Sequence, residues 1–274
     1  MNAARSHSTE SVLRNYRSHS LENFCPPLAN YLRNGLSVID VGCGPGTVTV
    51  NIAKMIGDGK VTGIDLEENS IAEAGALAAS VGVDNAEFVV GDAYSIPFAN
   101  DTFDFAFSSA CFEYLQDPIS AARELVRVTK PGGTVVVRAG DFGSMILYPQ
   151  CPTQMELIGL HLKDSTDSAD RYFNAYFGRE LFHVLSQSDL LEIEMVPFVP
   201  PLSCNYPGTE YFEWRRHMTG NWLDPDAWRK RRLFEDGEVT EETLNRARRE
   251  LDNWLNHPGS FFMVASMMGI GRVE

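Results

Sequence analysis

The sequence predicts an α/β fold: a doubly wound, seven-stranded and mostly parallel sheet, to which helical insertions add a cap. Three observations favour this fold. From residue 36 to 139, short β-branched and aromatic runs alternate with helix-like stretches, which is the pattern of βαβ units. The first run leads directly into a loop that contains three glycines. After residue 140 the alternation stops, and long segments of mixed polarity separate the remaining strands.

The alternating region contains five expected strands and three expected helices. The third helix begins at Pro118, because Asp117 is a good N-cap and proline suits the first helical position. It ends before Lys130, since Pro131 and the two glycines that follow cannot continue a helix. The expected strands are residues 36–41, 61–64, 87–90, 103–107 and 134–138, and the first two helices are residues 47–56 and 70–80.

The second half of the chain is expected to complete one domain over residues 1–274. We predict a helix over 179–187, strands over 191–196 and 261–270, and a helix after Thr240, but no strand within 141–176. The core then comprises about residues 20–140, 178–197 and 260–274, and insertions of about 141–177 and 198–259 form the cap. The alternative for 198–259 is a helical extension that only thickens the domain or forms a homodimer contact.

Composition narrows the range of partners. The chain has 274 residues, 44% hydrophobic and 22% charged, with a net charge of −14. A nucleic acid would be repelled by this charge, so a small neutral or cationic molecule is the expected partner. Five scattered cysteines without C-x-x-C spacing indicate a reduced, cytoplasmic protein without a metal site. The longest apolar run, 261–271, is too short to span a membrane.

The stretch VIDVGCGPGT, residues 38–47, joins the first expected strand to the first helix. Glycines in such a loop supply positive φ angles or allow a ligand to approach the backbone closely. A loop of this kind in an α/β sheet exposes backbone N–H groups and a helix N-terminus. The dinucleotide fingerprint G-x-G-x-x-G needs a third glycine at position 47, where this chain has Thr47.

Three aspartates lie near the ends of the first three strands: Asp40, Asp65 and Asp92. Asp65 follows the last loop glycine, Gly46, by 19 residues (65 − 46), close to the spacing of an acid that binds ribose hydroxyls. The carboxyl ends of parallel strands meet at one edge of the sheet, so these carboxylates are expected around one ligand. They would repel a pyrophosphate and attract a cationic, hydroxyl-bearing nucleoside.

Five segments of the chain resemble the successive motifs of class I S-adenosylmethionine-dependent methyltransferases. More narrowly, they are similar to the group that includes the ubiquinone and menaquinone biosynthesis C-methyltransferases. The resemblance spans residues 36–139 and implies a Rossmann-like fold, S-adenosyl-L-methionine as cofactor and transferase activity. The N-terminal signatures of the quinone enzymes are absent, so a quinone acceptor does not follow. The segments are VIDVGCGPGTVTV, VTGIDLEENS, AEFVVGDAYSIPF, FDFAFSSACFEYLQDP and ELVRVTKPGGTVVV.

The resemblance also implies a role for each cofactor-binding position. The loop glycines would pack against the methionine portion, and Asp40 would orient that loop and the amino group. Asp65 would accept hydrogen bonds from both ribose hydroxyls, and Asp92 from the adenine amine. The full implied set is Asp40, Gly42, Cys43, Gly44, Gly46, Asp65, Leu66, Asp92, Ala93 and Ser108.

The reaction itself is less defined by the sequence, because methyl transfer mainly requires alignment of nucleophile, methyl group and leaving sulfur. A general base is needed only when the nucleophile is protonated. The candidate catalytic residues are Tyr16, His19 and His161. Glu113, Tyr114 and Asp141 are further candidates for the acceptor side, and Cys111 is interpreted as a packing residue rather than a metalloid ligand.

The acceptor is expected to be a small molecule, apolar or aromatic, methylated on oxygen, nitrogen or carbon. Aromatic residues in the insertion 198–259 favour such an acceptor. Three alternative functions make different demands on the sequence. An NAD(P) oxidoreductase lacks its third fingerprint glycine here, whereas a cofactor-binding protein with a regulatory role, and a cyclase or isomerase, both remain open.

Overall fold

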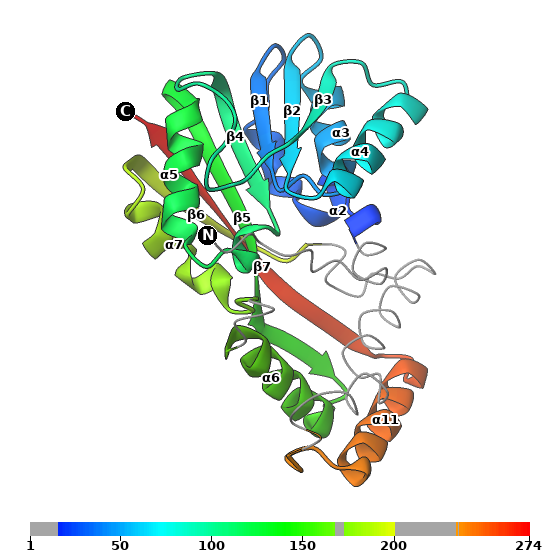
Figure 1. Ribbon diagram of the computed structural model, residues 1–274. Helices are drawn as coiled ribbons and strands as arrows, with labels where there is room; N and C mark the ends of the chain where they lie inside the picture. Colours follow the sequence, from blue (N-terminus) through cyan, green and yellow to red (C-terminus); the bar gives the residue numbers. More distant parts are fainter. Residues whose placement is uncertain (1–15, 168–172, 201–233, 235) are drawn as a thin grey trace.

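The computed structural model describes residues 16–167, 173–200, 234 and 236–274. A seven-stranded sheet with the order β3-β2-β1-β4-β5-β7-β6 forms its upper part (Figure 1). The strands β1 to β5 are parallel, and β7 is antiparallel to both of its neighbours. The predicted fold class is therefore confirmed. The strand order reverses between β1 and β4, and ligands of open α/β sheets bind at such a point.

The first half of the chain forms the elements that the sequence predicts, with ends shifted by a few residues. Asp117 caps α5 as expected, since its side chain accepts a hydrogen bond from the backbone N–H of Ser120 and Pro118 is the first helical residue. The strands are β1 (Ser37–Val41), β2 (Lys60–Asp65), β3 (Ala86–Val90) and β4 (Phe103–Ser109). The three predicted helices are α3 (Thr47–Met55), α4 (Glu68–Ser80) and α5 (Pro118–Val128). Three short helices were not predicted: α2 (Leu21–Phe24), η1 (Pro26–Asn30) and η2 (Phe112–Tyr114).

Helices cover both faces of the sheet. Buried side chains of α5 and of α7 (Phe177–Ser186) pack on one face with β4 and β5. Buried side chains of α2, η1 and α3 pack on the other face. The strand β6 (Leu190–Phe198) pairs with β7 at one edge of the sheet. Among the described residues, no helix combines the length and the apolar character that a membrane span requires.

The strand β5 corrects one prediction. It spans Thr129–Tyr148, well beyond the expected end at residue 138, and residues 141–148 were expected to contain no strand. Its extension pairs with the start of β7 (Phe261–Val273), so that Leu147 lies opposite Phe262. The sequence around Gly143 and Pro149 has the character of a loop. Pairing with a partner more than a hundred residues away overrides that local preference.

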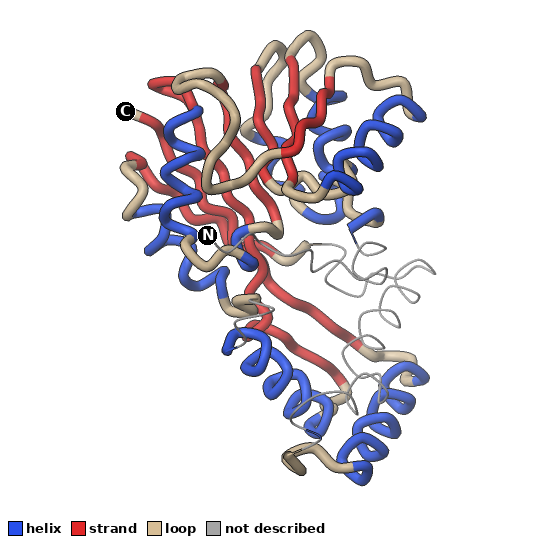
Figure 2. Tube along the Cα trace, viewed as in Figure 1, coloured by secondary structure: helices blue, strands red, loops and turns tan. Residues whose placement is uncertain are grey.

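The extended ribbon of β5 and β7 carries a second hydrophobic core, separate from the two faces of the sheet. Helices α6 (Pro152–Asp167) and α11 (Glu241–Asn256) flank the ribbon below the sheet (Figures 1 and 2). Trp254 is fully buried here, and its Nε1–H donates to the carbonyl of Phe261. Thr240 caps α11 as predicted. Residues 201–233 of the expected insertion lie outside the described residues.

Candidate active site

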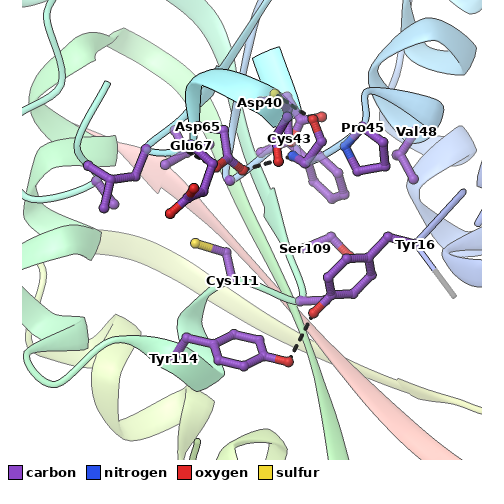
Figure 3. Close-up of a pocket in the computed structure, with 18 of the residues that line it drawn as sticks. Tyr16, Asp40, Cys43, Pro45, Val48, Asp65, Glu67, Ser109, Cys111 and Tyr114 are labelled. Atoms are coloured by element: carbon purple, nitrogen blue, oxygen red, sulfur yellow. Dashed lines mark hydrogen bonds between the residues drawn. The ribbon is translucent and has the colours of Figure 1, made fainter. Parts of the chain in front are cut away.

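A cavity lies at the carboxyl ends of the strands, where the order reverses between β1 and β4. Its described lining comes from residues 16–24 of the N-terminal segment and from loops within residues 40–115. Figure 3 shows two ends of this cavity. The glycine loop with Asp40 and Asp65 lies at one end, and Tyr16 and Tyr114 lie at the other, with Cys111 between them.

The glycine loop owes its shape to left-handed backbone at two positions of the cavity wall. Gly42 has φ +77°, and a Cβ there would lie 2.5 Å from the Cys111 sulfur, so only glycine fits. Gly44 has φ +52°, and a Cβ there would meet no atom within 4 Å. The backbone at Gly44 is therefore open on the cavity side, whereas that at Gly42 is closed by packing.

Asp65 ties the glycine loop to the end of β2. Its carboxylate accepts hydrogen bonds from the backbone N–H of Gly44 at 2.9 Å and of Glu67 at 3.0 Å. Beside it, the apolar side chain of Leu66 is 37% exposed although it lines the cavity. The carboxylate of Asp92 also lines the cavity and accepts the backbone N–H of Tyr94. This end thus offers carboxylate oxygens next to an exposed apolar surface.

Asp40 is buried at the floor of the same end. Its carboxylate accepts a hydrogen bond from the Thr49 hydroxyl at 2.6 Å. Burial raises the pKa of Asp40 to about 7, the Thr49 hydroxyl opposes this rise, and the charge of Asp65 adds to it. A cation placed in the cavity would favour the ionised form of Asp40, since opposite charges lower the pKa of a carboxyl group.

Two tyrosines close the opposite end. The hydroxyls of Tyr16 and Tyr114 lie 2.9 Å apart and share a hydrogen bond (Figure 3). Burial raises the pKa of Tyr114 to about 12 and that of Tyr16 well above 10. Both hydroxyls are therefore neutral near pH 7. They present aromatic faces and hydrogen-bonding groups to the cavity without adding charge.

His19 lines the cavity within a stack of three groups. Its ring packs on Phe24 with centroids 3.5 Å apart, and the guanidinium of Arg138 lies 3.7 Å from the same Phe24 centroid. Two groups this close to one ring must occupy its opposite faces. Burial lowers the pKa of His19 well below 6.5, and the charge of Arg138 lowers it further. His19 is thus a neutral imidazole that can accept a hydrogen bond.

A family comparison agrees with this geometry. Residues 38–133 match the model of the family described as "Methyltransferase domain". The match covers the glycine loop and all three strand-end aspartates. Residues 38–133 thus form a class I S-adenosylmethionine-dependent methyltransferase domain.

Curated relatives of this methyltransferase domain are similar over part of their length. An uncharacterized methyltransferase of Schizosaccharomyces pombe is 35% identical over 130 residues, which cover 45% of this chain and 46% of that protein. A demethylmenaquinone methyltransferase of Staphylococcus aureus is 38% identical over 106 residues, covering 38% of this chain and 43% of that protein. The chain therefore spans less than half the length of these two relatives.

A solved structure supports the fold over nearly the whole chain. The YcgJ protein of Bacillus subtilis superimposes with a TM-score of 0.56 at 19% identity, covering 91% of this chain and 97% of that one. At this identity the likeness establishes the fold alone. The acceptor of the methyltransferase domain must be argued from its own residues.

The residues at the glycine-loop end fit S-adenosylmethionine. The open backbone at Gly44 is a cradle that a side chain would fill. The carboxylates of Asp65 and Asp92 are acceptors suited to ribose hydroxyls and an adenine amine, and exposed Leu66 offers an apolar surface for a base. Within the described part of the chain, no three histidine, cysteine or acidic side chains are grouped as a metal site would require.

The structure brings most of the predicted site residues together. Two of the expected cofactor positions are not among the residues that line the cavity. Gly46 is the N-cap of α3, and a Cβ there would lie 2.6 Å from that of Ala74. Ser108 is fully buried, and its hydroxyl donates to the carbonyl of Val41. Ser109 reaches the cavity wall instead. Those that do line it are Asp40, Gly42, Cys43, Gly44, Asp65, Leu66, Asp92 and Ala93.

Some of the catalytic candidates line the cavity and others do not. Tyr16 and His19 line the cavity, whereas the side chain of His161, in α6, lies outside the described residues. Asp141 forms an ion pair with Arg179 at 2.7 Å. Arg138 was not among the predicted site residues; it is 4% exposed and packs on Phe24, which lines the cavity. Its signal was an arginine that follows three valines in a strand otherwise expected to be buried.

Proposed function

We propose that this chain transfers the methyl group of S-adenosylmethionine to a small-molecule acceptor held against Tyr16 and Tyr114. One observation carries the proposal: a single cavity joins the glycine-loop end, with its carboxylates, to an aromatic end with neutral hydroxyls. Methyl transfer needs two ligands aligned in one protected space, and this arrangement supplies two chemically distinct ends.

The glycine-loop end would hold the cofactor. Asp65 would accept hydrogen bonds from the ribose hydroxyls, and Asp92 from the adenine amine, with Leu66 packing on the base. The open backbone at Gly44 would contact the methionine portion. The bound cofactor supplies an electrophilic methyl group. Asp40 is buried beneath the glycine-loop end, and its ionised carboxylate would stabilise the positive charge of the cofactor.

The aromatic end would orient the acceptor and exclude water. Tyr16 comes from the N-terminal segment and Tyr114 from η2, so their hydrogen bond closes the cavity between two distant parts of the chain. Neutral His19 would accept a hydrogen bond from a nucleophile that arrives protonated and so orient it, because burial and the charge of Arg138 disfavour the protonated imidazole. An acceptor that needs no deprotonation would use the same wall for alignment only.

We also propose that the region below the sheet supports this wall. Asn174, shortly before α7, contacts η2 directly, because its backbone N–H donates to the carbonyl of Glu113 at 2.7 Å. The ring of Phe173 lies 4.9 Å from that of Tyr114. No described residue of 141–177 lines the cavity itself. The cap is thus proposed to hold Tyr114 in place.

Calorimetric titration tests the cofactor assignment. The protein is expected to bind S-adenosylmethionine and its demethylated product in the micromolar range, and not NAD. A response to NAD alone would overturn the assignment. Incubation with isotope-labelled cofactor and a small-molecule extract, analysed by mass spectrometry, then tests transfer. Binding without any labelled product would favour the alternative of a cofactor-binding protein with a regulatory, cyclase or isomerase role.

A further inference from the structure

A series of side-chain contacts runs from the strand β5 to the aromatic end of the cavity. The guanidinium of Arg138 lies 3.7 Å from the centroid of the Phe24 ring, and the His19 ring stacks on Phe24 with centroids 3.5 Å apart. The rings of His19 and Tyr16 lie edge to face, with centroids 5.5 Å apart, and the Tyr16 hydroxyl bonds that of Tyr114. The three residues of the N-terminal segment line the cavity, whereas Arg138 does not.

Arg138 is fixed by the sheet on its other side. Its register partner on the antiparallel strand β7 is Met268. Its Nη2 donates to the hydroxyl of Ser266 at 2.6 Å, and Ser266 lies two residues from Met268, on the same face of β7. The guanidinium is therefore held on a pair of strands, and a group on such rigid elements can position other groups precisely.

The positive charge of Arg138 is the unusual feature of this arrangement. The residue is buried and follows three valines in the strand. Its Nε has no hydrogen-bond partner, and no ion pair within 4.0 Å reaches it among the described contacts. Burying a charge without a partner in contact is costly, and an apolar side chain would fill such a position more easily. The charge therefore requires an explanation.

The charge acts on both aromatic groups of the stack. A cation over an aromatic face is attracted to it, most strongly where water is excluded, and Phe24 is buried. His19 lies on the other face of the same ring. Burial lowers the pKa of His19, and the charge of Arg138 lowers it further. The charged and titratable groups around the stack are Arg138 from β5, Glu113 from η2, and Tyr16 and Cys25 from the N-terminal part of the chain.

We propose that Arg138 is a positioning residue for the methyl acceptor: through Phe24, it holds His19 and Tyr16 at the aromatic end of the cavity. This inference rests on the proposed function for the term acceptor, but the contacts it describes do not require methyl transfer. Arg138 does not line the cavity, so it acts on an acceptor only through the N-terminal segment. Its cation fixes that segment against the sheet and opposes a proton on the imidazole.

Hydrogen exchange of the full chain, measured by mass spectrometry, tests the hold on the N-terminal segment. In Arg138→Met the backbone amides of residues 19–25 should exchange about tenfold faster than in the wild type, because a desolvated cation–π contact is lost. The amides of β1 should keep their wild-type rates. Arg138→Lys restores the cation and should recover most of the protection. Wild-type exchange of residues 19–25 in Arg138→Met overturns the proposal.

The matched control is Arg179→Met. Arg179 also lies over an aromatic ring, that of Tyr176, with its guanidinium carbon 5.0 Å from the centroid, but neither residue lines the cavity. This variant should leave the exchange of residues 19–25 at the wild-type rate. Accelerated exchange there in the control would show that the effect does not depend on the position of the cation, and would overturn the proposal.

Phe24→Leu tests the route by which Arg138 acts. This variant removes the ring and should itself accelerate the exchange of residues 19–23 by a similar factor. Arg138→Met should then add less than about twofold, because the two substitutions remove the same contact. Multiplicative effects would show that Arg138 acts by another route, and overturn the proposal. If Arg138→Met does not fold, Phe24→Leu alone still decides, because unchanged exchange in it overturns the proposal.

The titration of His19 distinguishes the charge of Arg138 from its packing. The imidazole resonance is assigned in NMR spectra by its absence from His19→Gln. In Arg138→Met the pKa of His19 should rise, because the opposing charge is gone, whereas in Arg138→Lys it should stay low. Methionine and lysine are of similar length, so a role in packing alone would leave the two variants alike. Equal titration of His19 in both variants overturns the proposal.

Titration with S-adenosylmethionine and incubation with labelled cofactor and a small-molecule extract separate this proposal from the proposed function. Arg138→Met should bind the cofactor within about threefold of the wild type and form labelled product at least about tenfold more slowly, with recovery in Arg138→Lys. Equal product formation in Arg138→Met and the wild type overturns the proposal. If the wild type forms no product while the exchange and His19 results are as expected, methyl transfer fails and the hold of Arg138 on His19 and Tyr16 stands.

Discussion

The two ends of the cavity are built in different ways. At the glycine-loop end, the residues that would contact a ligand lie on consecutive strand ends, from Asp40 through Asp65 to Asp92. At the aromatic end, the groups come from the N-terminal segment, the end of β4 and η2, as Tyr16, Ser109 and Tyr114 show. The first end depends on local backbone geometry, and the second on contacts between distant parts of the chain.

This difference explains how one fold can keep a cofactor and change its acceptor. The backbone of the glycine loop is fixed by φ angles that few other residues adopt, so its chemistry tolerates little change. The aromatic end depends on side chains, which substitution alters without disturbing the sheet. Damage to the glycine-loop end should therefore affect folding and cofactor binding together, whereas damage to the aromatic end should affect acceptor binding alone.

The largest expected effect follows from a Cβ at Gly42. Gly42→Ala should reduce the free energy of unfolding by about 2–6 kcal/mol, because left-handed strain adds to overpacking against Cys111. Gly44→Ala is the matched control, since a Cβ there meets no atom. It should fold with a smaller loss, of about 1–2 kcal/mol, and lose cofactor affinity. Urea unfolding and calorimetry measure the two effects. Wild-type cofactor affinity in Gly44→Ala would remove that backbone from the binding site.

The second effect concerns the pH dependence that Asp40 introduces. Its pKa rises from 3.8 to about 7 in the folded protein, so between these values the folded state keeps a proton that the unfolded state has lost. The contribution of Asp40 to stability is therefore present at low pH and is lost as the pH rises towards 7. It amounts to at most on the order of 4 kcal/mol over the full window.

Asp40→Asn should remove this component. Urea unfolding between pH 5 and 8 is expected to show a smaller fall in stability for the variant than for the wild type. Wild-type affinity for the cationic cofactor should also rise with pH over the same range, as Asp40 ionises. Parallel stability curves for the two proteins would show that Asp40 ionises normally in the folded state.

The third effect concerns Asp65 and cofactor affinity. Asp65→Asn should weaken S-adenosylmethionine binding by about 1–3 kcal/mol, because charge-assisted hydrogen bonds to ribose are lost. Asp104→Asn is the matched control at the opposite edge of the sheet, where Asp104 also accepts a backbone N–H, that of Ser37. The control should alter stability and leave affinity unchanged. Similar affinities in both variants would place the ribose away from Asp65.

The glycine-loop end of the cavity could be predicted from the sequence, whereas the surroundings of the aromatic end could not. The glycine loop and its aspartates were predictable because each motif is a short run with its own backbone requirements. Arg138 was not, because its burial depends on Phe24 and Ser266, which lie far away in the chain. The expected position of Ser108 at the cavity was displaced by one residue. Neighbouring residues of a strand point to opposite faces of the sheet, and the pairing of the strands determines which residue faces the cavity.

In the fold, too, elements set by local signals were predictable and those set by distant contacts were not. The strands and helices predicted up to residue 128 matched their ranges closely, since periodicity and caps are local signals, whereas the short helices α2, η1 and η2 were not predicted. The extension of β5 beyond residue 138 depends on pairing with β7, and no local pattern announced it. The helix after Thr240 was predictable from its cap and spacing, but its place beside α6 was not.

The smallest expected effect compares two helix caps, one in each part of the molecule. Asp117 caps α5 beside the sheet, and Thr240 caps α11 on the second core, each accepting the backbone N–H three residues later. Asp117→Ala and Thr240→Ala should each reduce the free energy of unfolding by about 1 kcal/mol. The strands β5 and β7 run without a break from the sheet into the second core. Because both cores share these strands, we expect them to unfold together.

Fluorescence and circular dichroism together test whether the two cores unfold in one transition. Trp254 is buried in the second core, so its fluorescence reports on that core when Trp214, Trp222 and Trp228 are replaced by phenylalanine, whereas far-UV circular dichroism reports on the whole chain. Both signals should shift together in both variants, and cofactor affinity in Thr240→Ala should stay within about twofold of the wild type, because α11 does not line the cavity. A fluorescence transition that moves alone in Thr240→Ala would contradict a single cooperative unit. The second core would then unfold independently, and the support it is proposed to give Tyr114 could be lost while the cofactor end remains folded.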